Sequence, residues 1–369
     1  MVALSNNTYL LELHADKEKT SNTDEVLSKV RGLFNEYFGE TEEVYRRTNE
    51  KSTLVVFDCS KKFLISVKLS PTGLILINID VEGEDSSTFN LEVAQKFESA
   101  LKEELSLVFI KVICPVRRGG PLDRYRYLNS SDERLLEYDV DHVVADVQSP
   151  FQHIQILHTI NFGNLLVLDD LQNLAESDLV YTETLIQRGK IDYTGKDILI
   201  LGAGDGALLW ELLKENPNMV TMVEIDETVM KLCSQHLRSA CGTALDSYSG
   251  PHHRIIVGDC VAEIDKFTAE GAKFDFVFSD LTDIPLSSVR QEKEWQFLWN
   301  ILEKSLGLLK DKGQFLTHGS GVSSVQSLAN FELHLKNLEP PVQFNRCHAF
   351  VPSFMEDWVF YQISRVSQD

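Results

Sequence analysis

A glycine-rich loop between an apolar segment and a helical one constrains the fold of this chain more than any other feature. The apolar segment ends at Leu201, and the next six residues read Gly-Ala-Gly-Asp-Gly-Ala. The loop satisfies the pattern G-x-G-x-x-[GA] at Gly202, Gly204 and Ala207, in the strand–loop–helix setting that this pattern requires. Apolar segments alternate with helical patterns from residue 193 onward, which predicts a C-terminal doubly wound, Rossmann-like α/β domain. The predicted strands of this domain are Ile198–Leu201, Val220–Ile225, Arg254–Val257, Phe274–Phe278 and Gln314–Thr317.

Acidic side chains follow four of these predicted strands. In an open parallel sheet, ligands bind at the carboxyl ends of the strands, so we expect the acids to converge on one crevice. Glu224, with Asp226 beside it, lies where an acidic side chain can accept hydrogen bonds from both ribose hydroxyls. Asp259 is placed to accept from an adenine amino group, with the backbone amide of Cys260 as a second contact. The four acids are Asp205, Glu224, Asp259 and Asp280.

Three of these acids also have a simpler interpretation. Asp205 could do no more than complement the positive end of a helix dipole. Glu224 could pair with Lys231 at the surface, and Asp259 could cap the helix that follows it. The sequence leaves these alternatives open.

The charge of Asp205 limits the class of ligand. Asp205 stands where a dinucleotide would place its pyrophosphate. Two negative charges about 4 Å apart, at an effective dielectric constant near 20, repel by about 4 kcal/mol, which disfavours NAD. The chain carries 56 Asp and Glu against 35 Lys and Arg, a formal charge of −21, so nucleic acid is not an expected partner. No G-K-[ST] follows the loop, so a nucleoside without phosphates fits the crevice best.

A sulfonium nucleoside has the chemistry that such a crevice requires. S-adenosylmethionine carries a carboxylate that Asp205 would repel, whereas its decarboxylated form presents an aminopropyl ammonium that Asp205 would attract. A primary amine, with an ordinary pKa of about 10.4, is protonated at pH 7, and Asp280 can take that proton before the nitrogen attacks the carbon next to sulfur. Carboxylates nearby also stabilise the positive charge that grows on the nitrogen. Methyl transfer from intact S-adenosylmethionine to an amine is one alternative, and a non-catalytic polyamine-binding scaffold is another.

Two further domains are predicted before the α/β domain. Residues 1–116 combine amphipathic helices with an antiparallel meander and carry no clustered chemistry, so we interpret them as an α+β dimerisation domain. Apolar and polar side chains alternate from about residue 134 to 171, which predicts a small antiparallel β domain over residues 117–180, and residues 181–369 form the predicted catalytic domain. Helices predicted from apolar periodicity include Asp24–Phe38, Asn90–Glu104 and Glu294–Leu309.

The composition also indicates where the protein works. The six cysteines form no paired framework, and no Cys or His spacing suits zinc, so we expect reduced thiols, no metal and no resident cofactor. The chain begins without a basic, apolar leader and contains no apolar run of about 20 residues. A cytoplasmic protein without a membrane partner is therefore expected.

Six segments carry a family resemblance: residues 150–154, 173–182, 200–206, 222–226, 279–282 and 351–358. They resemble the spermidine synthase family of aminopropyltransferases and, within it, the spermine synthase branch. The resemblance runs from about residue 118 to the end of the chain. It implies a methyltransferase-type catalytic domain that transfers the aminopropyl group of decarboxylated S-adenosylmethionine to spermidine, giving spermine and 5′-methylthioadenosine. Spermidine synthase and thermospermine synthase are the alternatives within the family, and the resemblance also implies a homodimer held by an N-terminal domain similar to S-adenosylmethionine decarboxylase.

The same resemblance implies roles for individual residues. Gln152 would contact the donor nucleoside, Asp205 would hold the amine of its aminopropyl group, and Asp280 would accept the proton. The residues implied in acceptor binding are Tyr181, Phe354 and, at the distal amine, Glu356. Each of these assignments has a simpler alternative, namely Gln152 facing solvent, Tyr181 in the core and Glu356 as a surface acid.

The chain departs from the family pattern at four positions. Ala203 and Ala207 stand where the family usually has glycine, and Ser279 replaces an asparagine next to Asp280. Phe354 stands where a tyrosine is expected, which puts one hydroxyl contact to the polyamine in doubt. None of these changes removes a predicted catalytic carboxylate, so we expect activity with altered affinity.

Overall fold

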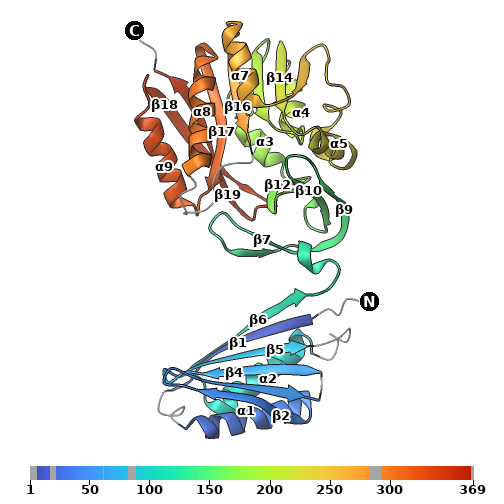
Figure 1. Ribbon diagram of the computed structural model, residues 1–369, viewed down its shortest axis with the longest axis vertical. Helices are drawn as coiled ribbons and strands as arrows, with labels where there is room; N and C mark the ends of the chain where they lie inside the picture. Colours follow the sequence, from blue (N-terminus) through green and yellow to red (C-terminus); the bar gives the residue numbers. More distant parts are fainter. Residues whose placement is uncertain (1–5, 17–21, 61, 82–88, 282–291, 367–369) are drawn as a thin grey trace. The chain divides into compact units, whose positions relative to one another are not determined.

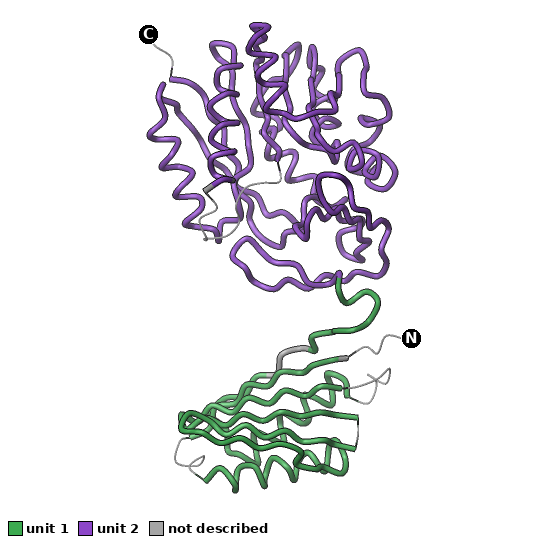
Figure 2. Tube along the Cα trace, in the orientation of Figure 1, with its two compact units in different colours: residues 1–124 green, residues 125–369 purple. Residues whose placement is uncertain are grey.

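The chain forms two compact units, residues 1–124 and 125–369 (Figure 2). The computed structural model describes residues 6–16, 22–60, 62–81, 89–281 and 292–366. Thr282, the last residue of one resembling segment, lies outside the described residues. None of the helices in the described part of the chain has the length and apolar character needed to cross a membrane.

A six-stranded antiparallel sheet forms the first unit (Figure 1). Its strands bury alternate residues, as in β3, because successive side chains of a strand point to opposite faces of the sheet. Helices α1 (Thr23–Phe38) and α2 (Leu91–Leu105) contribute Phe34 and Phe97 to the same core, and the two rings lie 6.0 Å apart. In sheet order the strands are β2 (Thr41–Thr48), β3 (Thr53–Cys59), β4 (Phe63–Leu69), β5 (Leu74–Val81), β1 (Asn6–His14) and β6 (Phe109–Arg118).

The second unit begins with small antiparallel sheets. A two-stranded hairpin is followed by a four-stranded sheet whose apolar face packs into one core with the helices of the α/β domain. The strands of the hairpin are β7 (Tyr127–Asn129) and β8 (Leu135–Glu137), and those of the sheet, in spatial order, are β12 (Leu171–Ala175), β11 (Gly163–Leu168), β10 (His153–Thr159) and β9 (Val140–Gln148).

A seven-stranded sheet forms the α/β domain, with five parallel strands and two antiparallel strands at one edge (Figure 1). Its central strand is buried on both faces: Ile198 and Ile200 belong to one core, and Leu199 and Leu201 belong to the other. Helices must therefore cover both faces, as expected for a doubly wound domain. In sheet order the strands are β15 (His253–Val257), β14 (Met219–Glu224), β13 (Asp197–Gly202), β16 (Phe274–Asp280), β17 (Leu309–Gly321), β19 (Glu356–Arg365) and β18 (Val342–Val351).

The helices of this domain are divided between the two cores. The core that includes the small sheet receives helices from the first half of the domain, and the opposite core receives α7, α8 and α9. Their bounds are α3 (Leu179–Leu185), α4 (Ala207–Leu213), α5 (Glu227–His236), α6 (Arg238–Cys241), α7 (Cys260–Ala269), α8 (Glu292–Gly307) and α9 (Val325–Lys336).

The structure differs from the sequence expectations at element ends and at sheet edges. The helix expected over 294–309 ends at Gly307, because Leu309 already pairs with Phe274 as the first residue of β17. The expected domain boundary after residue 116 falls inside β6, which continues to Arg118. The further division at residue 180 stays a prediction, since residues 125–369 form one compact unit. The strands that the sequence patterns did not predict are β1, β2, β7, β12, β18 and β19.

Candidate active site

A cavity of about 390 Å³ opens at the carboxyl ends of β13, β14, β15 and β16. This is the edge of the sheet at which open α/β domains bind ligands, and the volume lies in the range of small-molecule sites. The described residues that line the cavity include no Lys or Arg. Ten of the predicted site residues line it: Gln152, Tyr181, Gly202, Gly204, Asp205, Glu224, Asp259, Cys260, Asp280 and Phe354.

The glycine-rich loop brings its backbone against two of the acidic residues. Gly202 has a φ of +84°, and a Cβ there would lie 2.3 Å from the carbonyl oxygen of Asp280. A Cβ on Gly204 would lie 3.0 Å from the carboxyl carbon of Glu224. Because glycine lacks a Cβ, the loop can turn sharply and leave these carboxylates beside the cavity. The backbone N–H of Ala203 also donates to the carbonyl oxygen of Asp280 over 3.1 Å, which ties the ends of β13 and β16 together.

Asp205 and Asp280 are two partly buried carboxylates that line the cavity. Burial is the main reason why the pKa of each is raised above its ordinary value, and the charge of Asp280 raises the pKa of Asp205 further. Asp205 Oδ1 accepts from the N–H of Ala207 over 2.7 Å. Since the lining residues in the described part of the chain supply no cationic side chain, a positively charged ligand would stabilise both ionised carboxylates.

Glu224 lies beside this pair at the end of β14. Its side chain is 8% exposed, and burial raises its pKa to about 7. Glu224 Oε1 accepts from the N–H of Asp226 over 2.7 Å. The geometry places an acceptor at the strand end where a ribose is expected.

Tyr181 orients the carboxylate of Asp280. The phenol donates a hydrogen bond to Asp280 Oδ1 over 2.8 Å, and burial raises the pKa of Tyr181 well above its ordinary value, so the hydroxyl stays protonated. The ring contacts Phe354 at 6.0 Å between centroids, and Phe354 contacts Trp358 at 4.8 Å. Three aromatic side chains therefore form an apolar wall next to the acidic residues.

The position of Tyr181 depends on a second buried acid, Asp178. Its carboxylate accepts from the N–H of Ala175, from the N–H of Ser353 and from the Ser353 hydroxyl. These bonds connect the start of α3, which carries Tyr181, to the turn that carries Phe354. Because the Asp178 carboxylate accepts these hydrogen bonds from inside the protein, it acts as a positioning group.

His318 is a lining residue that the sequence analysis missed. It lies on β17, where its Nε2 is 3.1 Å from the carbonyl oxygen of Leu281 and 3.9 Å from Asp280 Oδ1. Burial lowers the pKa of His318, which favours the neutral imidazole. The available signal was topological: β17 is parallel to β16, so its carboxyl end reaches the same edge of the sheet.

Two predicted site residues do not line the cavity. Asp226 accepts from Ser149 Oγ over 2.6 Å and from Gln152 Nε2 over 3.1 Å, so it holds Gln152 at the wall. Glu356 is 6% exposed, and its two oxygens accept from the N–H and the hydroxyl of Ser131. Glu356 therefore anchors the turn of the β7–β8 hairpin, and its contact with a distal amine stays a prediction.

Asp259 and Cys260 lie at the rim of the cavity. Asp259 caps α7, because its Oδ1 accepts from the N–H of Val261 over 2.8 Å, as the simpler interpretation of this residue proposed. Both residues also line the cavity, so capping and ligand contact are compatible here. Cys260 is buried, and burial raises the pKa of its thiol to about 11, which keeps it uncharged at neutral pH.

Comparison with known families identifies the catalytic unit. Residues 178–368 match the family model described as the spermine/spermidine synthase domain, and residues 125–176 match the one described as the spermidine synthase tetramerisation domain. The chain belongs to the spermine/spermidine synthase family. The second match covers the small β-sheets, which the sequence analysis had treated as a domain without an assembly role.

Similar proteins and structures agree with this assignment. The chain is 28% identical over 239 residues to a polyamine aminopropyltransferase of Pyrobaculum neutrophilum, covering 64% of this chain and 79% of that protein. It is 32% identical over 191 residues to one of Desulforudis audaxviator, covering 50% of this chain and 64% of that protein. A crystal structure of spermidine synthase with the transition-state analogue AdoDATO has a TM-score of 0.55 at 20% identity and covers 66% of this chain and 80% of that one, which shows the fold.

Proposed function

We propose that this protein is a polyamine aminopropyltransferase that uses decarboxylated S-adenosylmethionine as donor and spermidine as acceptor. The observation that carries the proposal is the convergence of the buried Glu224 and the partly buried Asp205 and Asp280 on one cavity, whose described lining residues include no Lys or Arg. A ligand with a sulfonium and an ammonium group complements these acids. A polyamine acceptor adds further positive charge to the same place.

In this proposal each acid has a separate task. Asp205, in the glycine-rich loop, attracts the ammonium of the donor's aminopropyl group. Glu224 accepts hydrogen bonds from the ribose, and Gln152, which also lines the cavity, contacts the nucleoside. The intact methionine tail would bring a carboxylate to Asp205, and that repulsion selects the decarboxylated donor.

Asp280 is the proton acceptor of the proposed reaction. The hydrogen bond from Tyr181 fixes one of its oxygens, and the residue lines the cavity. Asp280 takes one proton from the ammonium group of the acceptor, and the neutral nitrogen then attacks the methylene carbon next to sulfur; the carbon–nitrogen bond forms as the carbon–sulfur bond breaks, and the electrons of the broken bond stay on sulfur. The sulfonium becomes a neutral thioether, so positive charge leaves the donor while it grows on the nitrogen, close to the carboxylates.

The aromatic wall supports a polyamine as the acceptor. Tyr181, Phe354 and Trp358 present apolar surface to the methylene groups between two amines, while the acids interact with the amines themselves. The segments that resemble the spermine branch favour spermidine, and spermine is then the proposed product. We further propose that the family's tetramerisation domain at residues 125–176 takes part in forming an oligomer, alongside the expected dimer contact of the N-terminal unit.

The test is a product analysis with paired substrates. The protein is incubated with decarboxylated S-adenosylmethionine and either spermidine or putrescine, and the products are identified by mass spectrometry after a separation that resolves spermine from thermospermine. Release of methylthioadenosine with spermine supports the full proposal, and release with only spermidine or thermospermine keeps the activity and corrects the acceptor or product. Binding of the donor without any transfer to either amine would contradict the proposal.

The same experiment distinguishes the alternative chemistry. Intact S-adenosylmethionine is supplied in parallel with the same amines. Methylated amine and S-adenosylhomocysteine would identify a methyltransferase and would show that Asp205 does not exclude the carboxylate. We expect neither product.

A further inference from the structure

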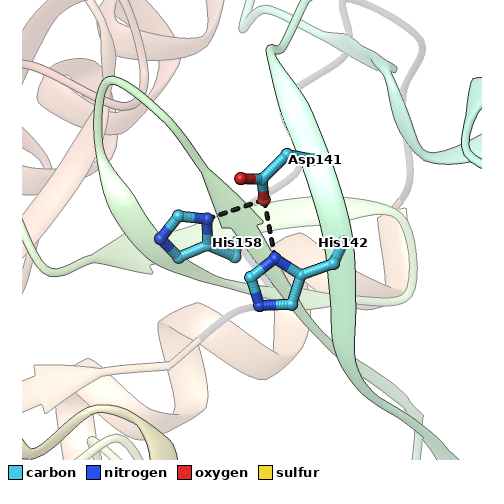
Figure 3. Close-up of side chains that lie close together, drawn as sticks. All are labelled: Asp141, His142 and His158. Carbon is cyan, nitrogen blue, oxygen red and sulfur yellow. Dashed lines mark hydrogen bonds and ion pairs between the residues drawn. The ribbon is translucent and has the colours of Figure 1, made fainter.

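A cluster of two histidines and one aspartate lies on the four-stranded sheet of the second unit. His142 on β9 and His158 on β10 are direct partners across the antiparallel ladder. Their rings stack at 4.6 Å between centroids and 20° between planes. The carboxylate of Asp141 lies between them (Figure 3). None of these residues lines the cavity described above.

A β-bulge explains why all three side chains meet. In a regular strand, Asp141 and His142 would point to opposite faces of the sheet. The ladder shifts here, since His158 pairs with His142 but the next residue, Thr159, pairs with Val140. The extra residue is Asp141, and a bulge of this kind re-aims a side chain. The carboxylate therefore shares a face with both rings.

The ligand atoms of the cluster converge on a single point. The Nδ1 atoms of His142 and His158 each lie 2.7 Å from Asp141 Oδ1 (Figure 3). The potential ligand atoms of the three residues all lie within 4.8 Å of one another. In a tetrahedral zinc site with bonds of about 2.0–2.1 Å, neighbouring ligand atoms are about 3.4 Å apart. Small side-chain rotations thus suffice to admit a cation between the rings and the carboxylate.

We propose that Asp141, His142 and His158 form a binding site for a divalent transition-metal ion, with Zn²⁺ as its best occupant. Two imidazole nitrogens and one carboxylate oxygen are a ligand set that zinc accepts, with water completing the tetrahedron. In the metal-free protein, hydrogen bonds from the two Nδ1–H groups to Asp141 hold the three groups together. On binding, each neutral ring moves its proton from Nδ1 to the solvent-facing Nε2, so no net proton release is required.

Access and charge both support this site. The side chains of His142, His158 and Asp141 are 59%, 34% and 44% exposed, so an ion can reach them from solvent. The formal charge of −21 raises the concentration of cations around the protein. The site lies in the part of the chain that matches the tetramerisation domain. Because its two histidines lie on β9 and β10, a bound metal would stiffen these two strands.

The matched control is a second His–Asp pair in the same sheet. His153 Nε2 lies 2.6 Å from Asp146 Oδ1, and this pair has only one histidine. The full-length protein without a histidine tag is titrated with ZnCl₂ by isothermal calorimetry, alongside His142→Gln, His158→Gln and His153→Gln. We expect one site with a micromolar or tighter Kd in the wild type and in His153→Gln. Affinity should fall at least tenfold in each of the other two variants.

Two further measurements separate the site from adventitious binding and from misfolding. Co²⁺ should give the intense visible absorption of a four-coordinate ion in the wild type and in His153→Gln, and this band should be absent in His158→Gln. Circular dichroism at equal temperature should show all variants folded, and Zn²⁺ should raise the Tm of the wild type more than that of His158→Gln. Equal zinc affinity in the wild type and the His142→Gln/His158→Gln double variant would overturn the proposal, as would loss of the site in His153→Gln alone.

Discussion

The N-terminal unit and the α/β domain have opposite kinds of interior. Among the described residues of the first unit, the buried polar groups are Thr8, Thr41, Thr53 and Asp123, and the core is filled with aromatic and aliphatic side chains. The α/β domain buries several carboxylates in addition to its apolar cores. The first interior is built for stability alone, whereas the second keeps charges that a stability optimum would exclude.

The buried carboxylates of the second unit divide further by how well they are satisfied. Asp178, Asp226 and Glu356 accept several hydrogen bonds each, and Glu211 pairs with Arg188 at 2.6 Å. Within the described residues, Asp280 accepts from the phenol of Tyr181, Asp205 from the N–H of Ala207 and Glu224 from the N–H of Asp226, and burial raises the pKa of each. The difference shows that burial by itself does not identify a site. A site is indicated where acids with unused lone pairs line a cavity.

The largest effect is expected from Asp280→Asn. The amide keeps the size of the side chain but cannot accept the proton, so kcat should fall by about 10³-fold, with a smaller change in KM. Single-turnover kinetics with saturating donor and acceptor measure the chemical step directly. The matched control is Asp275→Asn, on the same strand but outside the cavity, which should leave kcat within about twofold.

Asp280→Asn should lose activity without losing stability, as expected if the α/β domain keeps this acid for catalysis and the N-terminal core is built for stability. Because Asp280 is buried with a raised pKa, the unliganded Asp280→Asn variant should be at least as stable as the wild type at pH 8. A destabilised variant at that pH would indicate that Asp280 serves the fold, against its proposed catalytic role.

The stability of the unliganded protein should depend on pH through the same acids. The folded-state pKa values of Asp205, Glu224 and Asp280 are raised, so their contribution is full below the ordinary carboxylate range and is lost as pH rises toward about 7. Urea unfolding at pH 5 and pH 8, compared between the wild type and Glu224→Gln, isolates one group. We expect the wild type to lose about 2 kcal/mol more than the variant over this range.

The contribution of His318 to the pH dependence of stability cancels in the comparison of the wild type with Glu224→Gln. The pKa of His318 is lowered in the fold, so its contribution has the opposite sign and falls as pH decreases. His318 is present in both proteins, and the difference between them reports Glu224. Parallel curves for the two proteins would show that Glu224 titrates normally in the cavity.

The apolar interior is tested by Phe34→Leu. Phe34 on α1 is fully buried against Phe57 and Phe97, and the smaller side chain should cost about 1.5 kcal/mol of unfolding free energy. The kcat of the folded protein should not change, because this core contains no residue of the cavity. Denaturant unfolding and steady-state kinetics on the same sample provide both values.

The smallest effect is expected from Ala203→Gly in the loop. Ala203 has a φ of +64°, a left-handed conformation that costs a residue with a Cβ about 1 kcal/mol and costs glycine little. Part of this gain is offset by the flexibility of glycine in the unfolded chain, so we expect a stabilisation of about 0.5 kcal/mol. A destabilised variant would show that the Ala203 methyl group makes compensating contacts in the core.

The sequence was most informative where local patterns carry the physics. Strand–loop–helix repetition located the five parallel strands, and the rule that such strands end at one edge placed Asp205, Glu224 and Asp280 around one cavity. The antiparallel strands β18 and β19 were not predicted as part of the sheet, because β19 joins it by pairing with β17, which lies far away in sequence. The polar, mostly exposed β2 gave no apolar pattern at all.

The sequence by itself determined the chemistry of the cavity, since an acid at the end of each strand needs only the order of residues along the chain. Tertiary structure decided which acids remain available to a ligand. The Glu356 carboxylate accepts a hydrogen bond from Ser131, which is 225 residues away. His318 approaches Asp280 from another strand. Strand pairing and one bulge also brought together His142, His158 and Asp141, which no spacing along the chain suggests. Hydrogen-bond partners and strand registers of this kind are set by packing across the fold, so a linear pattern does not contain them.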